Sequence, residues 1–503
     1  MRASTTVIPP DILPSFVIES KDRSYKHQYA NIYFVRLRLL RQVIEKRATR
    51  LWGAYDEKPI AVPRVLEVVK EQFCYIIGTV YMDMPLKPNV VEEIARDHSI
   101  PPPPPLPKYY SEDDSVMLED ESGRIKLVGE CLKYAHLVTG VVVGALGAGS
   151  SSGDFEVLEL CFPEFAPHLD REVDRNDMDI DSDGAIESLE IKPRPYIVLI
   201  VSAPDEWIAV VSGLNVGLPS LSETTIDMLS EFLTGEAGAP EDQAIAAQIS
   251  RLIVAGNSLA NASQYMPKEN SDRLERRTIR RRGQNTVSLS PHPILNLTSH
   301  LRDIGQTMPI HILPGENDPS GVILPQQPFP RAMFGEASRT TSFYCETNPT
   351  YLRLKCDRDP ATTRTLLINS GQLLDDIFKY LQSPPNTRLS VLESTLKWRH
   401  IAPTAPDTLW CHPYFSKDPF VVKATPDIYI VGCQRRFGTK LVTRHNADDD
   451  NVPQRCRIIL VPNFSETGIL VLVNLRNLEV KTIHFTIEGK DETKEDIPQR
   501  KCL

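Results

Sequence analysis

The sequence has few of the features that mark secreted, membrane-spanning or zinc-binding proteins. Its nine cysteines, an odd number in 503 residues, include no C-x-x-C pair. Reduced thiols in the cytosol or nucleus are therefore expected rather than a disulfide framework or a zinc knuckle. The longest weakly polar stretch, Val138 to Gly149, is too short and too rich in glycine to span a bilayer, and Met1 opens no charged-then-apolar signal segment. We expect no membrane role.

Positive charge is also scarce. The formal net charge is -10, so the chain as a whole repels a phosphate backbone, and strong autonomous DNA binding would need a local reversal of that field. The one reversal runs from Arg273 to Arg282, with six arginines in ten residues. It fits a nuclear-import signal, a phosphate-contacting patch or a solvated loop between two core strands, and the sequence leaves these open. We expect DNA to be contacted only indirectly, through partners.

The chain contains 41% apolar residues, which is enough to form globular cores. Its length suggests two to four domains. Short apolar runs in its C-terminal two-thirds each end in a turn. Runs of Val, Ile and Leu closed by Gly, Asn or Pro predict strands that are buried on both faces and carry functional loops at their C-terminal ends. The runs are Ile208 to Gly217, Leu252 to Leu259, Pro309 to Asp318, Leu366 to Asp376, Asp427 to Gly438 and Arg457 to Ser465.

The turns after these runs resemble the metal-binding turns of calcineurin-like metallophosphoesterases, but without the metal ligands. In that family the turns read D-x-H, G-D, G-N-H-D, a lone His and G-H-x-H, because two divalent ions need a shell of carboxylate and imidazole ligands. The corresponding positions here are Ser212-Gly213-Leu214, Gly256-Asn257, Gly315-Glu316-Asn317-Asp318, Ser370 and Gly432-Cys433-Gln434-Arg435. Leu214 offers no lone pair, Arg435 brings a positive charge, and only Asp318 is unchanged. We therefore expect no catalytic, cofactor-binding or metal-binding residues.

Longer phrases resemble the small (second, B-type) subunits of eukaryotic DNA polymerase delta. The most specific is RHIAPTAPDTL at residues 399–409; the others are Ser212 to Leu214, Leu324 to Pro328, Ser370 to Gln372 with Asp375-Asp376, Val461 to Ser465 and Val473 to Arg476. The resemblance implies a nuclear scaffold subunit for DNA replication and repair. Such a subunit grips the cysteine-rich C-terminal domain of the polymerase catalytic subunit and the N-terminal domain of a third subunit. The family also permits sharing with polymerase zeta.

The resemblance further implies an α/β plus all-β fold class. This comprises an N-terminal helix, an oligonucleotide/oligosaccharide-binding (OB) barrel and an inactive calcineurin-like phosphoesterase sandwich. We expect an N-terminal helical segment in residues 1–53, an OB-fold domain in 54–166, an acidic linker in 167–193, an inactive phosphoesterase-like domain in 194–488 and a C-terminal tail in 489–503. Helices are expected in the sandwich at Ser222 to Thr234 and Gln243 to Arg251.

The residue patterns of the N-terminal third agree with this division. Ser24 to Trp52 reads as a helix with a broad apolar face, docked on its own domain or in a partner groove. Several β-like runs follow, with a short helix from Val90 to Asp97, and this content suits an OB barrel. The runs are Phe73 to Met84, Ser115 to Glu119, Arg124 to Cys131, Val138 to Leu146 and Asp154 to Cys161. Few of their aromatic residues alternate with Lys or Arg, so a protein-binding barrel is expected rather than a single-strand-binding one.

The acidic linker contains residues with the spacing of a calcium site. Asp179, Asp181, Asp183, Gly184 and Glu190 fit the EF-hand pattern D-x-D-x-D-G-x5-E. An EF-hand needs a helix that leaves the loop, but the two prolines that follow, at positions 193 and 195, forbid one. We expect no specific calcium binding.

Three functions remain open on the sequence alone, and the non-catalytic scaffold is favoured. A metallophosphoesterase would have to build an atypical site from Asp318, Asn257, Asn317 and His400. Without the metal shell such an enzyme would lose both the Lewis acid and the activated water, and His400 suits a buried structural role better. An independent single-stranded-DNA-binding OB protein would need basic residues alternating with aromatic ones along the barrel, and that sign is weak here.

Overall fold

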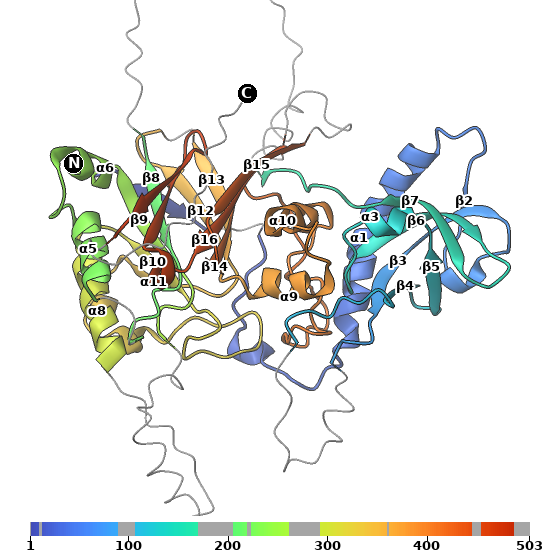
Figure 1. Cartoon of the computed structure of the whole chain (residues 1–503), viewed down its shortest axis with the longest axis horizontal. Helices are drawn as coiled ribbons and strands as arrows, with labels where there is room; N and C mark the ends of the chain where they lie inside the picture. Colours follow the sequence, from blue (N-terminus) through green and yellow to red (C-terminus); the bar gives the residue numbers. More distant parts are fainter. Residues whose placement is uncertain are drawn as a thin grey trace, which may run out of the picture.

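The structure, a computed structural model, describes residues 2–9, 13–88, 106–169, 205–218, 223–260, 292–359, 362–444 and 454–486. Figure 1 shows two bodies side by side along the long axis, a large sandwich of sheets and a smaller barrel. Some sequence interpretations lie outside the described residues: the helix from Val90 to Asp97, the EF-hand-like spacing from Asp179 to Glu190, the arginine cluster Arg273 to Arg282 and the tail 489–503. Among the described helices, none combines the length and apolarity needed to cross a membrane.

Two six-stranded sheets form the sandwich. The first has the order β1–β12–β13–β14–β16–β15, formed by Thr5–Ile8, Thr350–Cys356, Thr363–Asn369, Ile428–Gln434, Gln454–Pro462 and Gly438–Arg444. The second has the order β11–β10–β9–β8–β17–β18, formed by Phe343–Cys345, Ile310–Leu313, Ile249–Ala255, Trp207–Val211, Ile469–Asn474 and Val480–His484. The strands predicted from apolar runs are confirmed as β8, β9 and β10 in one sheet and β13, β14 and β16 in the other. They run parallel within each sheet.

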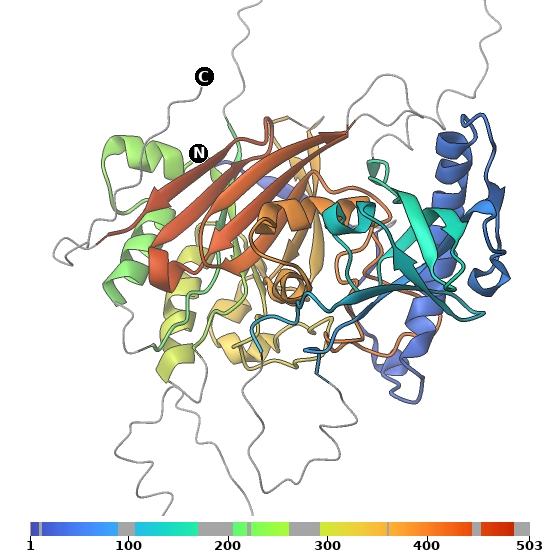
Figure 2. The ribbon, with the colours of Figure 1, turned by 45° about the vertical axis from the view of Figure 1, so that its right-hand side comes forward.

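The space between the two sheets is filled by aliphatic side chains from both inner faces, which is the burial that holds such a sandwich together. They include Ile208, Val210, Ile253, Leu354, Leu366, Ile368, Ile428, Ile430, Ile459, Val461, Val471 and Val473. Helices α5 (Glu223–Thr234) and α8 (His292–Gly305) cover the outer face of the second sheet. Helices α9 (Gln372–Tyr380) and α10 (Arg388–Lys397) lie on the first sheet, on the side that faces the barrel (Figure 2). The result is the expected layered α/β architecture; its kinship to phosphoesterases stays a prediction.

The expected helix from Gln243 to Arg251 is wrong. Helix α6 (Pro240–Ala246) ends before this segment is complete, and β9 begins at Ile249. β9 lies between β8 and β10 with all of its residues buried, so sheet pairing on both sides determines its structure. Further short helices among the described residues are η1 (Ser20–Asp22), η2 (Val65–Glu67), α3 (Cys131–Tyr134), η4 (Arg331–Phe334), η5 (Ala337–Arg339) and α11 (Phe464–Thr467).

The barrel is a sheet closed on itself, with the order β2–β3–β4–β5–β7–β6 and a further pairing of β3 with β6. Its strands are Ile60–Ala61, Phe73–Asp83, Ser115–Glu119, Arg124–Val128, Phe155–Cys161 and Val142–Gly149. All the runs predicted as strands are present. β5 ends earlier than expected because the chain turns into helix α3, and β6 begins later. Closure of this kind leaves the barrel without long unpaired edges, as in OB folds.

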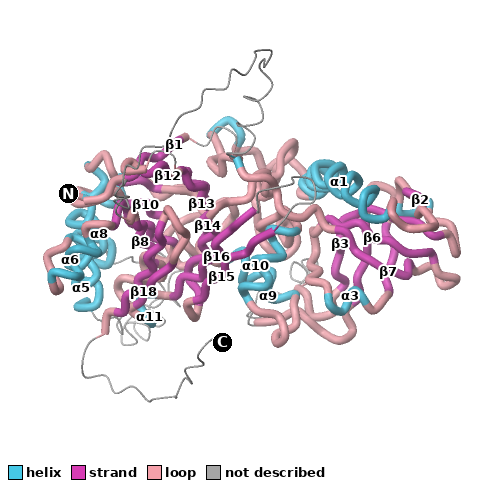
Figure 3. Tube along the Cα trace, turned by 90° about the horizontal axis from the view of Figure 1, so that it is seen from above, coloured by secondary structure: helices cyan, strands magenta, loops and turns pink. Residues whose placement is uncertain are grey.

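Helix α1 (Ala30–Trp52) covers the barrel, and it begins at Ala30 rather than at Ser24. Its face formed by Leu37, Leu40, Ile44, Ala48 and Trp52 packs on residues of β3, β6 and β7. Figure 3 shows the helix beside these strands. Docking on its own domain, one of the two alternatives for this helix, is therefore what the structure shows.

The N-terminal strand β1 joins the sandwich although the barrel follows it in the sequence. Thr5 pairs with Cys356 of β12 in the first sheet. Arg251 of β9, in the second sheet, donates from Nε to Thr5 Oγ1 (2.8 Å) and from Nη2 to the Thr5 carbonyl (2.6 Å). β1 thus connects both sheets, and the barrel is an insertion between β1 and the rest of the sandwich. The domain division predicted from the sequence did not include β1 in the sandwich. The predicted domain boundaries stay predictions.

Candidate functional site

The C-terminal ends of the predicted strands meet at one edge of the sandwich and are hydrogen-bonded to one another. The Gly213 amide donates to the Gly256 carbonyl at 2.9 Å, the Cys433 amide to Ser212 Oγ at 2.9 Å, and the Phe464 amide to the Ser212 carbonyl at 2.8 Å. We refer to these turns as the strand tips, formed by residues 212–217, 256–259, 314–318, 370–371, 432–435 and 462–465. The turns that follow the predicted strands therefore lie together at this edge.

Several glycines let the strand tips touch backbone to backbone. A Cβ added at Gly256 would overlap the Ser370 side chain, one at Gly315 would overlap the Asn257 amide, and one at Gly432 would overlap the Ala255 carbonyl. Gly256 also has φ +89, a conformation that favours glycine. At these points the strand tips are in direct contact.

Asp318, the one residue that matches the expected metal-binding turns, connects two tips by hydrogen bonds. Its Oδ1 accepts the Leu259 amide at 2.8 Å, and its Oδ2 accepts the amides of Gly315 at 2.8 Å and Ser258 at 3.2 Å. Burial raises the pKa of Asp318 to about 6, and these N–H donors offset part of that rise. Both carboxylate oxygens are therefore engaged by the protein's own backbone.

Ser370, predicted to stand at the position of the lone histidine, lies in a cluster of carboxamides. Asn348 Nδ2 donates to Ser370 Oγ and to Gln326 Oε1, both at 2.6 Å, and Asn348 Oδ1 accepts the Ser370 amide at 3.0 Å. Asn348 and Gln326 are buried. Sequence reasoning missed Asn348, which comes from a loop that carries no apolar-run or motif signal.

The residues at the strand tips do not fit a pair of divalent ions. Such ions take carboxylate and imidazole ligands, whereas the tips offer mainly hydroxyl, carboxamide and backbone groups. Of their two carboxylates, Asp318 is engaged by backbone amides and Glu316 is exposed. Leu214 is buried in the apolar core and Arg435 is exposed. Over the described part of the chain, no group of three or more His, Cys, Asp or Glu side chains could hold a metal ion. Asn257 accepts the Asn317 amide at 2.9 Å.

A second buried cluster connects α1 and the barrel to the sandwich. Arg36 of α1 donates from Nε to Asp418 Oδ2 at 2.8 Å, and His400 Nε2 lies 2.9 Å from the same oxygen. The other guanidinium nitrogens of Arg36 donate to the carbonyls of Gly140, Pro403 and Ala405 at 2.7 to 3.1 Å. We refer to Arg36, His400 and Asp418 as the joint; all three are buried.

Electrostatics keep the joint in one protonation state. Burial and the nearby Arg36 charge lower the pKa of His400 to about 4, so its ring is neutral at pH 7. His400 Nδ1 accepts the Ala402 amide at 3.2 Å, which leaves Nε2 as the donor to Asp418. Burial alone would raise the pKa of Asp418, but His400 and Arg36 hold it below its usual range.

The phrase at residues 399–409 contacts the barrel side near both of its ends and helix α9 of the sandwich in between. Arg399 Nε donates to the Glu164 carbonyl at 2.6 Å, and Asp407 Oδ2 accepts from Lys87 Nζ at 2.8 Å. The hydroxyls of two threonines in the phrase, at positions 404 and 408, donate to Asp376 Oδ2 at 2.6 and 2.7 Å. His400 thus lies in a buried cluster with Arg36 and Asp418, which fits the buried structural role that the sequence favours.

Arg36 and Asp418 were missed by sequence reasoning. A signal for Arg36 does exist, because it stands on the i, i+4 ridge formed by Ile32, Leu40 and Ile44, all of which are buried. A single arginine on an apolar helix face predicts a buried partner for its charge. The identity of that partner could not be predicted, since Asp418 is 382 residues away in the sequence.

Comparison with known proteins gives matches over both bodies. Residues 28–160 match the family described as the DNA polymerase delta subunit OB-fold domain, and residues 208–439 match the family of B subunits of DNA polymerases alpha and epsilon. The chain is 33% identical to the DNA polymerase delta small subunit of Arabidopsis thaliana, over 92% of each chain. It is 32% identical to that of Saccharomyces cerevisiae, over 93% of this chain and 91% of the relative. It is 29% identical to the DNA polymerase delta subunit 2 of Drosophila melanogaster, over 95% and 97%.

Proposed function

The chain belongs to the family of DNA polymerase delta small subunits, and from this premise we propose that it is a non-catalytic scaffold subunit of a DNA polymerase delta complex. Its work is to hold other subunits together in DNA replication and repair. Polymerase activity then belongs to the catalytic partner. We place this work in the nucleus, where such a complex acts on DNA.

The absence of catalysis is supported by the strand tips, which carry the proposal. Both carboxylate oxygens of Asp318 accept hydrogen bonds from backbone amides. The tips also pack against each other at Gly256, Gly315 and Gly432. A metallophosphoesterase needs open ligand positions for its ions and an activated water. The likeness to an inactive phosphoesterase sandwich, together with the barrel, gives a frame for binding rather than for chemistry.

Two partners follow from the family resemblance. One is the catalytic subunit, gripped by its cysteine-rich C-terminal domain, and the other is a third subunit, gripped by its N-terminal domain. The buried joint supports this role, because Arg36, His400 and Asp418 fix the barrel rigidly on the sandwich. DNA is then contacted only indirectly, in line with the net charge of -10. Polymerase zeta is a second assembly that could share the subunit.

Co-expression with the cysteine-rich C-terminal domain of the catalytic subunit, followed by gel filtration, tests the proposal. We expect the two chains to co-elute. Failure to co-elute, with a third subunit also failing to bind, would remove the scaffold function.

An assay for phosphodiesterase activity with added Mn²⁺ tests the catalytic alternative. We expect no turnover, since the tips lack the ligands for an ion pair. Turnover that disappears in Asp318→Ala, but not in a variant of an exposed acid such as Glu316→Ala, would establish an atypical enzyme instead.

A further inference from the structure

Hydrogen bonds attach the N-terminal strap, residues 2–8, to both layers of the sandwich. Arg2 Nη2 donates to the Leu233 carbonyl near the end of α5, and the Ala3 amide donates to the Ala247 carbonyl at 2.8 Å. β1 then pairs with β12 alone, so it is an edge strand of the first sheet. Of its four residues only Thr5 is fully buried, whereas every residue of β9 is buried. The strap therefore depends on its polar contacts more than the inner strands do.

The contact of the strap with the second sheet is made by Arg251, and Arg251 is in turn oriented by His311. Nε and Nη2 of Arg251 donate to Thr5. The third guanidinium nitrogen, Nη1, lies 2.5 Å from His311 Nε2, and His311 Nδ1 lies 2.8 Å from Glu346 Oε1. Arg251 and His311 are both only 1% exposed. A chain of polar contacts thus runs from Glu346 through His311 and Arg251 to Thr5.

The neighbours of His311 require its ring to be neutral. A guanidinium can only donate hydrogen bonds, so Nε2 must accept, and the ring proton must be on Nδ1, directed at Glu346. Burial lowers the pKa of His311, and the charge of Arg251 adds to this, although the hydrogen bond to Glu346 acts in the opposite direction. The ring is therefore uncharged at pH 7 and serves as the acceptor for Arg251.

Two further ionisable side chains face this cluster. Tyr344 of β11 stacks on the His311 ring, with ring centres 4.7 Å apart. Asp357, after β12, accepts the Thr6 hydroxyl at 2.8 Å and attracts the charge of Arg251. β1 itself contributes no charged side chain. Of all these groups, only a histidine ordinarily changes its charge between pH 5 and pH 8.

We propose that His311 is a pH-dependent switch for the strap: the neutral ring holds Arg251 on Thr5, and the protonated ring releases it. A proton on Nε2 would face the N–H groups of Arg251, so two donors and two positive charges would meet in a buried site. Arg251 then turns away, and Thr5 loses the donors to its hydroxyl and its carbonyl. The strap detaches from the second sheet, and the edge of β12 opens. The inference is independent of the scaffold function, since it concerns how the sandwich is closed.

The size of the effect follows from proton linkage. In the detached state the ring is solvated and titrates near its ordinary pKa of about 6.5, whereas in the attached state burial keeps the pKa of His311 lower. Detachment therefore takes up a proton, so attachment is strongest above pH 6.5 and is lost as pH falls toward the lower pKa. Between pH 7.5 and pH 5.5 the equilibrium constant for detachment should rise by about tenfold.

Hydrogen–deuterium exchange of the full chain at pH 7.5 and pH 5.5, corrected for the intrinsic exchange rates, tests the switch. In the wild type, peptides that cover Thr5–Ile8 should exchange about tenfold faster at pH 5.5. His311→Gln keeps an acceptor for Arg251 and a donor for Glu346 but cannot be protonated, so its β1 exchange should be the same at both pH values. His300→Gln is the matched control, because His300 lies on α8 beside Asp227, and it should respond to acid as the wild type does.

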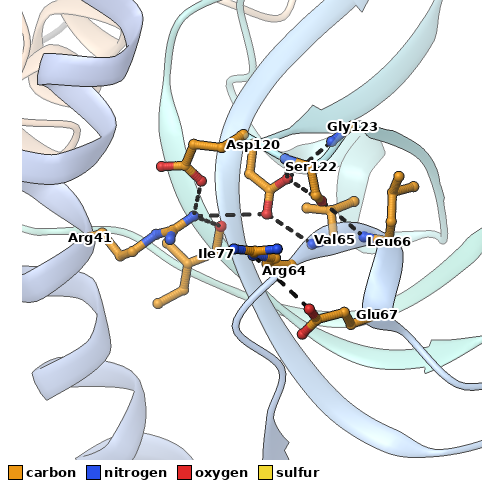
Figure 4. Close-up of polar contacts among 10 residues, drawn as sticks. Arg41, Arg64, Val65, Leu66, Glu67, Ile77, Asp120, Ser122 and Gly123 are labelled. Carbon is orange, nitrogen blue, oxygen red and sulfur yellow. Dashed lines mark hydrogen bonds and ion pairs between the residues drawn. The ribbon is translucent and has the colours of Figure 1, made fainter.

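Two other segments serve as references in the same measurement. β14 lies inside the first sheet and reports unfolding of the sandwich. In the barrel, Asp120 accepts the amides of Val65 and Ser122 at 2.8 and 2.7 Å, and Figure 4 shows this turn with Arg41 directed at it. Burial alone would raise the pKa of Asp120, but the hydrogen bonds hold it below its usual value, so the turn stays charged at pH 5.5. Both references should remain protected at pH 5.5.

An equal acid response in the wild type and in His311→Gln would overturn the inference, and so would the absence of a response in the wild type. Loss of protection in β14 together with β1 would show unfolding of the whole sandwich, which also overturns it. Glu346→Gln provides a second test should His311→Gln prove unstable. Without the carboxylate the protonated ring is less favourable, so the strap should detach at a lower pH than in the wild type. Detachment at the same or a higher pH would contradict the switch.

Discussion

The strand tips and the joint are both buried and polar, yet they are built from different groups. The tips are held by backbone amides, hydroxyls and carboxamides around one carboxylate, Asp318. The joint is held by a full ion pair, Arg36 with Asp418, and by the neutral His400. The tips lie at the C-terminal ends of parallel strands, where many enzymes have their active sites. The joint lies where the barrel meets the sandwich.

The pKa values show what this difference means. Burial raises the pKa of Asp318 to about 6, because only neutral N–H donors compensate its charge. At the joint the opposite charges and the hydrogen bond hold the pKa of Asp418 below its usual range despite its burial. The joint therefore depends on complete charge pairing, while the tips depend on close packing.

Breaking the joint should have the largest effect. Arg36→Met leaves Asp418 buried without its cation and leaves three carbonyls without a donor, so we expect a loss of about 3 to 5 kcal/mol in the free energy of unfolding. Urea unfolding of the full chain measures it. Arg38→Met, two positions along the same helix and exposed, is the control and should change stability by no more than about 0.5 kcal/mol. Equal effects in the two variants would refute the role of the joint.

Acidification should change the contributions of the two clusters to the free energy of unfolding in opposite directions. The pKa of His400 falls from 6.5 to about 4 on folding, so the unfolded chain binds its proton first, and stability is lost as pH falls from about 6.5 toward 4. The pKa of Asp318 rises from 3.8 to about 6, so the folded chain binds its proton first, and stability is gained as pH falls through about 6. Each contribution to the free energy of unfolding is at most about 3.5 kcal/mol.

Unfolding at pH 7.5 and pH 5 of the wild type, His400→Gln and Asp318→Asn checks this. We expect His400→Gln to be less sensitive to acid than the wild type and Asp318→Asn to be more sensitive. A shift of both variants in the same direction would contradict the assignment of opposite signs.

A single methyl group at the strand tips should have a smaller effect. Gly256 has φ +89, and a Cβ there would overlap Ser370, whereas Gly153 has φ +93 with nothing near its Cβ position. Both glycines have a similar positive φ, which disfavours alanine, so the difference between Gly256→Ala and Gly153→Ala mainly reports the packing of the tips. We expect Gly256→Ala to be less stable by about 1 to 3 kcal/mol in urea unfolding. Equal stability of the two variants would mean that the tips can separate freely.

The sequence predicted the strands well because each buried parallel strand is an unbroken apolar run, a pattern that is visible in the local sequence. β9 and β14 are examples. The prediction failed where contacts with residues far away in the sequence determine the local structure. The first part of β9 was predicted as helix because Ser250 and Arg251 are polar, whereas in the fold both are buried and hydrogen-bonded to Thr5. The positions of Ser212, Asn257 and Ser370 at the tips were predicted from the turns that follow the apolar runs. Their hydrogen bonds were not, because residues such as Asn348 reach them only through the fold.

The pairing of β1 with β12 has a consequence for synthesis on the ribosome. β1 leaves the exit tunnel long before Thr350–Cys356 exist, and the complete barrel is made in between. The nascent barrel can fold first, with its own sheet closed, while β1 waits without a partner. Closure of the sandwich by β1 is then a late, long-range step, the kind that slows folding and exposes an open sheet edge.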